Sequence, residues 1–154
     1  MPLPIWGAAQ PKAKITVTFR TQTKTAIANK DGKWKVTLDP ISAEKLSSVN
    51  KASKGRSLTV ASELNEETTT ITIENILIGE VWLCSGQSNM AGRFGRDPYP
   101  RGSIAKADYP ALRRLEGGEW IISTPDTAGR FSRVGYCFAR KVQQETMVPV
   151  GLLI

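Results

Sequence analysis

The sequence predicts an all-β sandwich over residues 1–75, followed by the opening part of an α/β domain with a parallel sheet over residues 76–154. Two observations predict this division. Before residue 75, apolar and polar residues alternate in short runs separated by turn residues, which is typical of half-buried antiparallel strands. After residue 75, the apolar runs become continuous and one segment takes on helical spacing, which is typical of a βαβ unit.

The first half contains several short predicted strands. Residues 15–19 and 34–38 alternate between apolar and polar side chains, and residues 58–60 and 69–73 continue the pattern at similar spacing. Such a period of two indicates strands with one buried face. Residues 29–32 read Asn-Lys-Asp-Gly between the first two runs, and the Asp-Gly pair predicts a hairpin turn.

Three features set the limits of the two predicted domains. Residues 42–56 are rich in Ser, Lys and Asn and predict a long surface loop. Residues 2–7 resemble the middle of a passage from strand to turn, so the first strand of the sandwich is expected to be absent. The chain stops on Leu-Leu-Ile, inside an expected central strand, so we expect an incomplete α/β domain.

The second half reads as strand, connection, helix and strand. Residues 81–84 form an apolar run that predicts a strand buried on both faces. Residues 91–129 are rich in Gly, Pro and Arg and are expected to be mostly loop. Residues 134–146 have helical spacing, with Arg140, Lys141, Gln143 and Gln144 facing away from an apolar side formed by Val134, Cys137, Phe138 and Val142. Pro149 ends this helix, and residues 150–154 predict a second buried strand.

The net charge of +7 is spread evenly along the chain. Residues 1–78 hold 11 Lys and Arg against 7 Asp and Glu, and residues 79–154 hold 10 against 7. Without a basic tail or run, this excess predicts solvated surface and no nucleic-acid partner. No apolar run approaches the roughly 18 residues that cross a bilayer, so we expect no membrane association, and the first residues lack a signal-peptide pattern.

The absence of histidine limits the chemistry of the chain. Ser-His-Asp, Cys-His and His-ligated metal sites all require this residue, so we expect neither a complete hydrolase site nor a metal site. The two cysteines, Cys84 and Cys137, each lie in an apolar run. This favours two buried thiols over a disulfide.

Ser88 is the strongest candidate for a reactive residue. It lies in Ser-Gly-Gln-Ser-Asn-Met at residues 85–90, directly after a predicted strand, and active groups of parallel sheets lie at the carboxyl ends of strands. Gly86 permits a tight turn, after which Ser88 could act as a nucleophile beside backbone N–H groups that stabilise an oxyanion. The residues alone favour a helix-capping serine over a nucleophile, and Met90 departs from the Gly-x-Ser-x-Gly elbow.

Residues 78–90 resemble the nucleophile block of the sialate O-acetylesterase family, a branch of the SGNH (GDSL-like) hydrolases. Five further segments resemble this family in the same order, so that most of the chain is covered: residues 4–7, 31–38, 116–120, 131–136 and 148–152. The resemblance implies that residues 76–154 are the N-terminal part of a flavodoxin-like SGNH-hydrolase sheet.

The resemblance implies an enzyme that removes O-acetyl groups from sialic acid or a similar sugar without a cofactor. Ser88 would attack the ester carbonyl, and the backbone N–H groups of Ser88 and Gly135 would stabilise the oxyanion. Gly135 could equally be a close-packing position at the start of its helix. The family's Asp-x-x-His pair has no counterpart in this chain, which is therefore expected to be a nearly inactive fragment that a second chain could complete. The full-length protein is expected to be secreted or periplasmic.

Two departures from the family pattern concern the substrate and the sheet. After Met90 the chain reads Ala-Gly-Arg, as in the related acetylxylan esterases, so acetylated xylan is an alternative substrate. Between Arg114 and Leu115 a longer segment is expected, equivalent to one missing strand. The alternative function is a non-catalytic carbohydrate-binding or interaction module, or a degenerate pseudo-enzyme.

Other side chains have simpler interpretations. Three arginines near Ser88 could bind a sugar carboxylate, but are expected to be solvated loop charges: Arg93, Arg96 and Arg101. Three aspartates are expected at the surface, because no histidine exists for them to orient: Asp97, Asp108 and Asp126. The tryptophans are expected in the core rather than stacked on sugars: Trp6, Trp34, Trp82 and Trp120.

Overall fold

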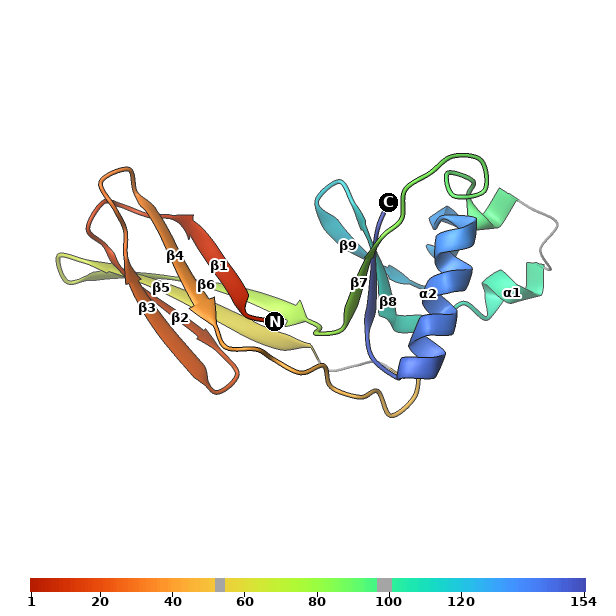
Figure 1. Cartoon of the computed structure of the whole chain (residues 1–154), viewed down its shortest axis with the longest axis horizontal. Helices are drawn as coiled ribbons and strands as arrows, with labels where there is room; N and C mark the ends of the chain where they lie inside the picture. Colours follow the sequence, from red (N-terminus) through yellow and green to blue (C-terminus); the bar gives the residue numbers. More distant parts are fainter. Residues whose placement is uncertain (52–54, 97–100) are drawn as a thin grey trace. The chain divides into compact units, whose positions relative to one another are not determined.

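The chain forms two compact units, both built mostly from β-strands (Figure 1). The computed structural model describes residues 1–51, 55–96 and 101–154, with only the backbone of residues 96, 101 and 102. The first unit comprises Met1–Ser42 and Lys54–Ile76, and the second comprises Ala43–Ser53 and Leu77–Ile154. The expected first domain, residues 1–75, is therefore interrupted by a segment that packs with the second unit.

The interrupting segment Ala43–Ser53 has no helix or strand in its described residues, as expected of a loop, but its side chains hold it on the second unit. The Leu46 N–H donates to the carbonyl oxygen of Met147 at 2.6 Å, and Asn50 Nδ2 donates to that of Asp108 at 3.0 Å. Leu46 is buried and Val49 packs against the core of this unit. Two apolar side chains in a polar stretch thus determine where this loop lies.

The first unit consists of two antiparallel sheets. One pairs β1 (Leu3–Ala8) with β4 (Lys33–Leu38). The other has the order β3-β2-β5-β6 and is formed by β2 (Lys14–Phe19), β3 (Gln22–Ile27), β5 (Arg56–Leu64) and β6 (Glu67–Ile76). The alternation predicted from the sequence is observed in β2 and β4, whose apolar side chains are buried: Ile15, Val17, Phe19, Trp34, Val36 and Leu38.

The turn at residues 29–32 forms, but it does not close the predicted hairpin. Asn29 Oδ1 accepts hydrogen bonds from the N–H groups of Asp31 at 3.0 Å and Lys33 at 2.8 Å, and Gly32 has a φ of 74°. The turn joins β3 to β4, which belong to different sheets. The prediction was wrong because β3 was not recognised. Its sequence, Gln-Thr-Lys-Thr-Ala-Ile, contains only one large apolar residue, so it lacks the alternation that would have revealed a strand.

The second unit contains a four-stranded sheet of order β7-β10-β8-β9. The strands are β7 (Glu80–Leu83), β8 (Tyr109–Glu116), β9 (Glu119–Ser123) and β10 (Val150–Leu153). β10 is parallel to both β7 and β8, and β9 returns antiparallel to β8. Short helices η1 (Phe94–Arg96), α1 (Arg101–Ala105) and η2 (Ala128–Arg130) lie in the connections, and the longer α2 (Arg133–Thr146) covers one face (Figure 1).

Residues 91–129 are therefore not mostly loop, because β8 and β9 lie within them. β8 runs without interruption through Arg114 and Leu115, where a missing strand was expected. The sequence pattern did not reveal β8 as a strand, because an arginine is usually expected at the surface. Arg114 is nevertheless buried. The guanidinium of Arg114 pairs with Glu116 and lies 5.4 Å from the ring centroid of Phe131. A buried arginine with these partners occupies a strand position that a sequence pattern assigns to surface.

β7 was predicted to be buried on both faces, and this prediction was wrong. Val81, Trp82 and Leu83 are 59%, 41% and 76% exposed. β7 is at one end of the sheet order, with β10 as its neighbour. A strand with a continuous apolar run is buried on both faces only when it has a neighbouring strand on each side and both faces of its sheet are covered.

α2 matches the predicted helix closely in extent but not in orientation. Its buried side contains Gly135, Tyr136, Ala139 and Gln143, whereas Val134 and Phe138 are exposed. The small residues Gly135 and Ala139 let the helix approach the sheet, and Tyr136 supplies the apolar volume. Among the described residues, no helix is both long and apolar enough to span a membrane.

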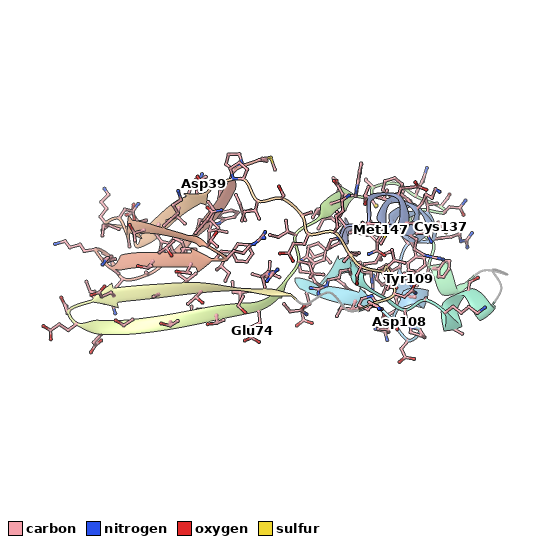
Figure 2. All side chains as sticks on the ribbon, turned by 90° about the horizontal axis from the view of Figure 1, so that it is seen from below. Asp39, Glu74, Asp108, Tyr109, Cys137 and Met147 are labelled. Carbon is pink, nitrogen blue, oxygen red and sulfur yellow. The ribbon has the colours of Figure 1, made fainter. Side chains whose placement is uncertain are left out.

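The two cysteines differ in burial, although both were expected to be buried. Cys84 is buried at the end of β7, and Cys137, labelled on α2 in Figure 2, is exposed. Both thiols are free. Cys137 is exposed because it lies on the side of α2 that turns away from the sheet.

Tyr136 is at the centre of the second unit's core. Its ring is fully buried, with centroids 4.5 Å from Phe94 and 5.5 Å from Phe131. Its hydroxyl lies 3.3 Å from Ser123 Oγ, which donates to the carbonyl oxygen of Ala107 at 3.2 Å. This buried polar chain links α2 to β9 and to the residues before β8, and burial raises the pKa of Tyr136.

We expect Tyr136→Ala to lower the free energy of unfolding by about 3–5 kcal/mol, because it leaves a large cavity in the core. Tyr136→Phe keeps the ring and removes only the hydroxyl, so we expect a loss of about 0.5–1.5 kcal/mol. Urea denaturation at pH 7 measures both. Equal losses for the two variants would show that the ring does not support the core.

The raised pKa of Tyr136 also predicts a loss of stability in alkali. As the pH rises above the ordinary tyrosine value of about 10, the unfolded state releases this proton before the folded state does, so unfolding becomes more favourable. We expect the parent chain to lose more stability than Tyr136→Phe between about pH 9 and pH 11, measured by denaturant midpoints. Identical pH profiles would contradict this.

Candidate active site

Ser88 lies in an exposed turn directly after β7. The N–H of Gly92 donates to the carbonyl oxygen of Ser88 at 2.7 Å, and that of Met90 donates to Gln87 at 3.1 Å. Ser88 has a φ of 53°, in the left-handed region that a residue with a side chain adopts only when its surroundings hold it there. An exposed, strained serine at the end of a parallel strand resembles the arrangement of a nucleophile elbow.

Gly86 provides the tight turn that leads to Ser88. Its φ of 146° is disfavoured for any residue with a side chain. A Cβ at this position would also lie 3.3 Å from the Cβ of Met90. Gly86 lies three residues after Leu83, the last residue of β7, and two residues before Ser88, so it lets the chain turn between the strand and the serine.

The beginning of α2 holds the turn that carries Ser88. Arg133 donates twice, from its backbone N–H to the carbonyl oxygen of Gly92 at 2.8 Å and from Nη1 to Asn89 Oδ1 at 3.0 Å. Ser132 forms a β-bridge with Arg93, and its hydroxyl donates to Met90 Sδ at 3.3 Å. The residues that follow Ser88 are thus fixed to one helix terminus.

Gly135, the expected second oxyanion donor, is buried in the first turn of α2. Its N–H donates to Ser132 Oγ at 3.1 Å, so Ser132 caps the helix and satisfies this amide. A Cβ on Gly135 would lie 3.2 Å from the Ser132 Cβ and 3.5 Å from Cys84 Sγ. This geometry supports the close-packing role. An oxyanion role stays a prediction and requires the amide to exchange the Ser132 hydroxyl for the substrate.

Cys84 is the cysteine nearest to Ser88 along the chain, and its surroundings suppress its reactivity. The thiol is buried, and burial raises its pKa. Cys84 therefore remains protonated at neutral pH and is not a competing nucleophile.

Three of the six remaining predicted side chains lie within the described part of the chain. Arg93, Asp108 and Asp126 are exposed, as expected. Asp97 lies outside the described residues, as do the side chains of Arg96 and Arg101. Within the described part of the chain, no group of three His, Cys, Asp or Glu side chains could hold a metal ion.

The tryptophans were predicted to be in the core, and this was wrong for three of them. Trp34 is buried, whereas Trp6, Trp82 and Trp120 are exposed. Trp82 packs edge-on against Phe138 of α2, with ring centroids 5.1 Å apart. The exposed tryptophans lie on strands whose outer face or edge has no covering element among the described residues.

Two residues that organise the turn, Ser132 and Arg133, were not predicted from the sequence. The signal for Ser132 was present, because a serine directly before a helical run is a common cap. No pattern in the sequence relates Arg133 to Asn89, which lies 44 positions earlier.

The chain is similar to sialate O-acetylesterases and to one carbohydrate acetylesterase of known structure. The human sialate O-acetylesterase is 33% identical over 92 residues and the rat enzyme 35% over 94, each match covering 56% of this chain. A carbohydrate acetylesterase from Xanthomonas citri superimposes with a TM-score of 0.82 and 31% identity over 99% of this chain. No family model matches the chain.

This chain is much shorter than the proteins it resembles. It spans 16% of the human sialate O-acetylesterase and 15% of the rat enzyme. It spans 35% of the Xanthomonas citri carbohydrate acetylesterase. Most of each relative therefore has no counterpart in these residues.

We expect Ser132→Ala to lower the free energy of unfolding by about 1 kcal/mol, because it leaves the Gly135 amide without its capping oxygen. Ser47→Ala, at an exposed serine of the same unit, should change it by less than about 0.5 kcal/mol. Chemical denaturation measures both. Equal effects would show that the cap does not stabilise the start of α2.

Proposed function

We propose that this chain, a relative of the sialate O-acetylesterases, carries the nucleophile of a carbohydrate O-acetylesterase. The observation that carries the proposal is the conformation of Ser88, which is exposed and left-handed at the end of a parallel strand. The surrounding block is the part of the sequence that most resembles the family. In this proposal residues 76–154 are the opening part of an SGNH-hydrolase sheet and residues 1–75 a β-sandwich.

The proposed reaction is acetyl transfer through Ser88. The hydroxyl oxygen attacks the carbonyl carbon of an O-acetylated sugar, its proton passes to a base, and the backbone N–H of Ser88 donates to the oxyanion. The sugar then leaves with a proton from that base, and water releases acetate from the acetyl-serine. The substrate class is an O-acetylated sugar, with sialic acid first and acetylated xylan second.

The base has to come from polypeptide outside these residues, because the chain has no histidine. In serine hydrolases a histidine takes the nucleophile's proton, and loss of a triad member leaves only about 10³–10⁴-fold acceleration over water. The supplier is either a continuation of the same polypeptide or a second chain.

The test is a hybrid in which residues 1–154 are followed by the part of the Xanthomonas citri carbohydrate acetylesterase that has no counterpart here. We expect the hybrid to release acetate from O-acetylated sialic acid or acetylated xylan. Ser88→Ala should reduce turnover by about 10³-fold or more, because it removes the nucleophile. The 154-residue chain alone should remain near background.

A fluorophosphonate probe with intact-mass readout gives a second measurement. The hybrid should gain one adduct, Ser88→Ala should gain none, and Ser47→Ala should react as the parent does. Acetate release that persists in Ser88→Ala, or equal turnover by the chain alone, would contradict the proposal.

A second candidate function is carbohydrate binding by the first unit. A hollow in this unit is lined only by polar side chains, which suit sugar hydroxyls and carboxylates: Thr18, Arg20, Thr21, Arg56, Ser57 and Thr59. If this is the function, NMR titration of the intact chain with a sialic acid glycoside should shift these residues, and Thr59→Val should weaken the response. Shifts confined to the Ser88 turn would exclude it.

A further inference from the structure

Arg133 is a cation at a position where a helix does not favour one. It is the first residue of α2, directly after the capping residue Ser132. The N-terminal end of a helix carries a partial positive charge, so a cation in the first turn destabilises the helix. The first turn of α2 contains no acidic side chain. The charge of Arg133 therefore does not stabilise the helix that it begins.

The guanidinium of Arg133 reaches the residue that follows Ser88. Its Nη1 donates to Asn89 Oδ1 at 3.0 Å, across 44 positions of the chain. Because the donor is charged, this hydrogen bond is stronger than one between neutral groups. A guanidinium offers only donors, so the side-chain amide of Asn89 has to present its oxygen to it. Arg133 thus fixes both the position and the orientation of the Asn89 side chain.

Hydrogen bonds join Arg133 and the turn in a closed circuit. The Ser88 carbonyl oxygen accepts from the Gly92 N–H at 2.7 Å, and the Gly92 carbonyl oxygen accepts from the Arg133 N–H at 2.8 Å. The Arg133 guanidinium closes the circuit at Asn89, which is bonded covalently to Ser88. Ser88 belongs to this circuit through its carbonyl group. The guanidinium supplies the link that a substitution can remove without changing a backbone group.

The backbone of Ser88 needs support, because its φ of 53° is unfavourable for a residue with a side chain. Such a conformation persists only while its surroundings over-determine it, and Ser88 itself is exposed. In acyl transfer the attacking oxygen has to lie within about 3–3.5 Å of the carbonyl carbon, with its orbital aligned. A turn that relaxes therefore attacks its substrate more slowly.

We infer that Arg133 is a positioning residue for Ser88 and that it acts through Asn89. The inference rests on the proposed function, because it names the side chain that holds the turn while the Ser88 oxygen attacks the acetyl carbon. In this role Arg133 exchanges no proton with the substrate. The role also accounts for a cation at the start of α2, where the charge opposes the helix dipole.

The test compares Arg133→Met with Arg133→Lys in the hybrid that carries the rest of the Xanthomonas citri enzyme. Methionine keeps a long unbranched side chain and removes the donors, whereas lysine restores a charged donor. Arg130→Met is the matched control, because Arg130 is exposed and lies three positions before Arg133. This control removes the same charge from the same segment of the chain.

We expect Arg133→Met to lower kcat for acetate release by about 10- to 100-fold and to leave KM within about twofold, because a misplaced nucleophile slows the attack and not substrate binding. Arg133→Lys should recover most of the loss, and Arg130→Met should match the parent. Asn89→Ala should cause a similar loss, and Arg133→Met should add little to it, since both variants break the same hydrogen bond. An unchanged kcat in Arg133→Met, or a second full loss in the double variant, would overturn the inference.

Stability separates positioning from a structural role. In urea denaturation of the 154-residue chain, the midpoint for Arg133→Met should equal or exceed that of the parent, because the substitution removes a cation from the start of α2. A midpoint below that of Arg130→Met would assign Arg133 to folding instead.

Amide hydrogen exchange at Gly92 tests the contact without any turnover, since this amide donates to Ser88. In the 154-residue chain, Arg133→Met should speed this exchange about tenfold, and Arg130→Met should leave it unchanged. Faster exchange together with a hybrid that releases no acetate would keep Arg133 as the residue that holds the turn and reject the proposed reaction. Equal exchange in Arg133→Met and Arg130→Met would overturn the inference, whatever the turnover of the hybrid.

Discussion

The close contact between the first turn of α2 and the end of β7 is the constraint on which the rest of the second unit depends. A Cβ built on Gly135 would lie 3.2 Å from the Ser132 Cβ and 3.5 Å from Cys84 Sγ, so the first turn of α2 packs against the end of β7. Ser132 then caps the helix, and the same segment fixes Asn89, Met90 and Gly92. The helix terminus that closes the core therefore also holds the residues that follow Ser88.

Tyr136 connects this contact to the core. It is the residue after Gly135, and its ring fills the space between the sheet and η1, while its hydroxyl reaches Ser123. The core lies entirely on the α2 side of the sheet, since Val150 and Leu152 point into it. The unit is therefore stabilised from one side, and the strand that carries the candidate nucleophile is the least buried of the four.

Local sequence patterns correctly predicted the elements in which the spacing of apolar residues matches the burial seen in the structure or the residues of an element match its observed extent. β2 and β4 alternate clearly, and α2 is helical over almost the predicted residues. The sequence pattern did not predict burial where the burial of a residue depends on other elements of the fold. The side of α2 that packs on the sheet is chosen by Gly135 and Ala139, which carry no hydrophobic signal. The exposure of β7 depends on neighbours, and β8 contains an arginine buried by partners on other elements. Ser88 was found through resemblance, and its strain could be seen only in the structure.

The path of the chain between the two units bears on how such a protein can be rearranged in evolution. The polypeptide enters the second unit at Ala43, returns to the first at Lys54, and leaves again after Ile76. A single recombination junction near residue 76 would separate the sheet of the second unit from Leu46 and Asn50, which it uses for its own packing and hydrogen bonding. The two units are therefore interleaved along the gene, and a transferable cassette has to include both.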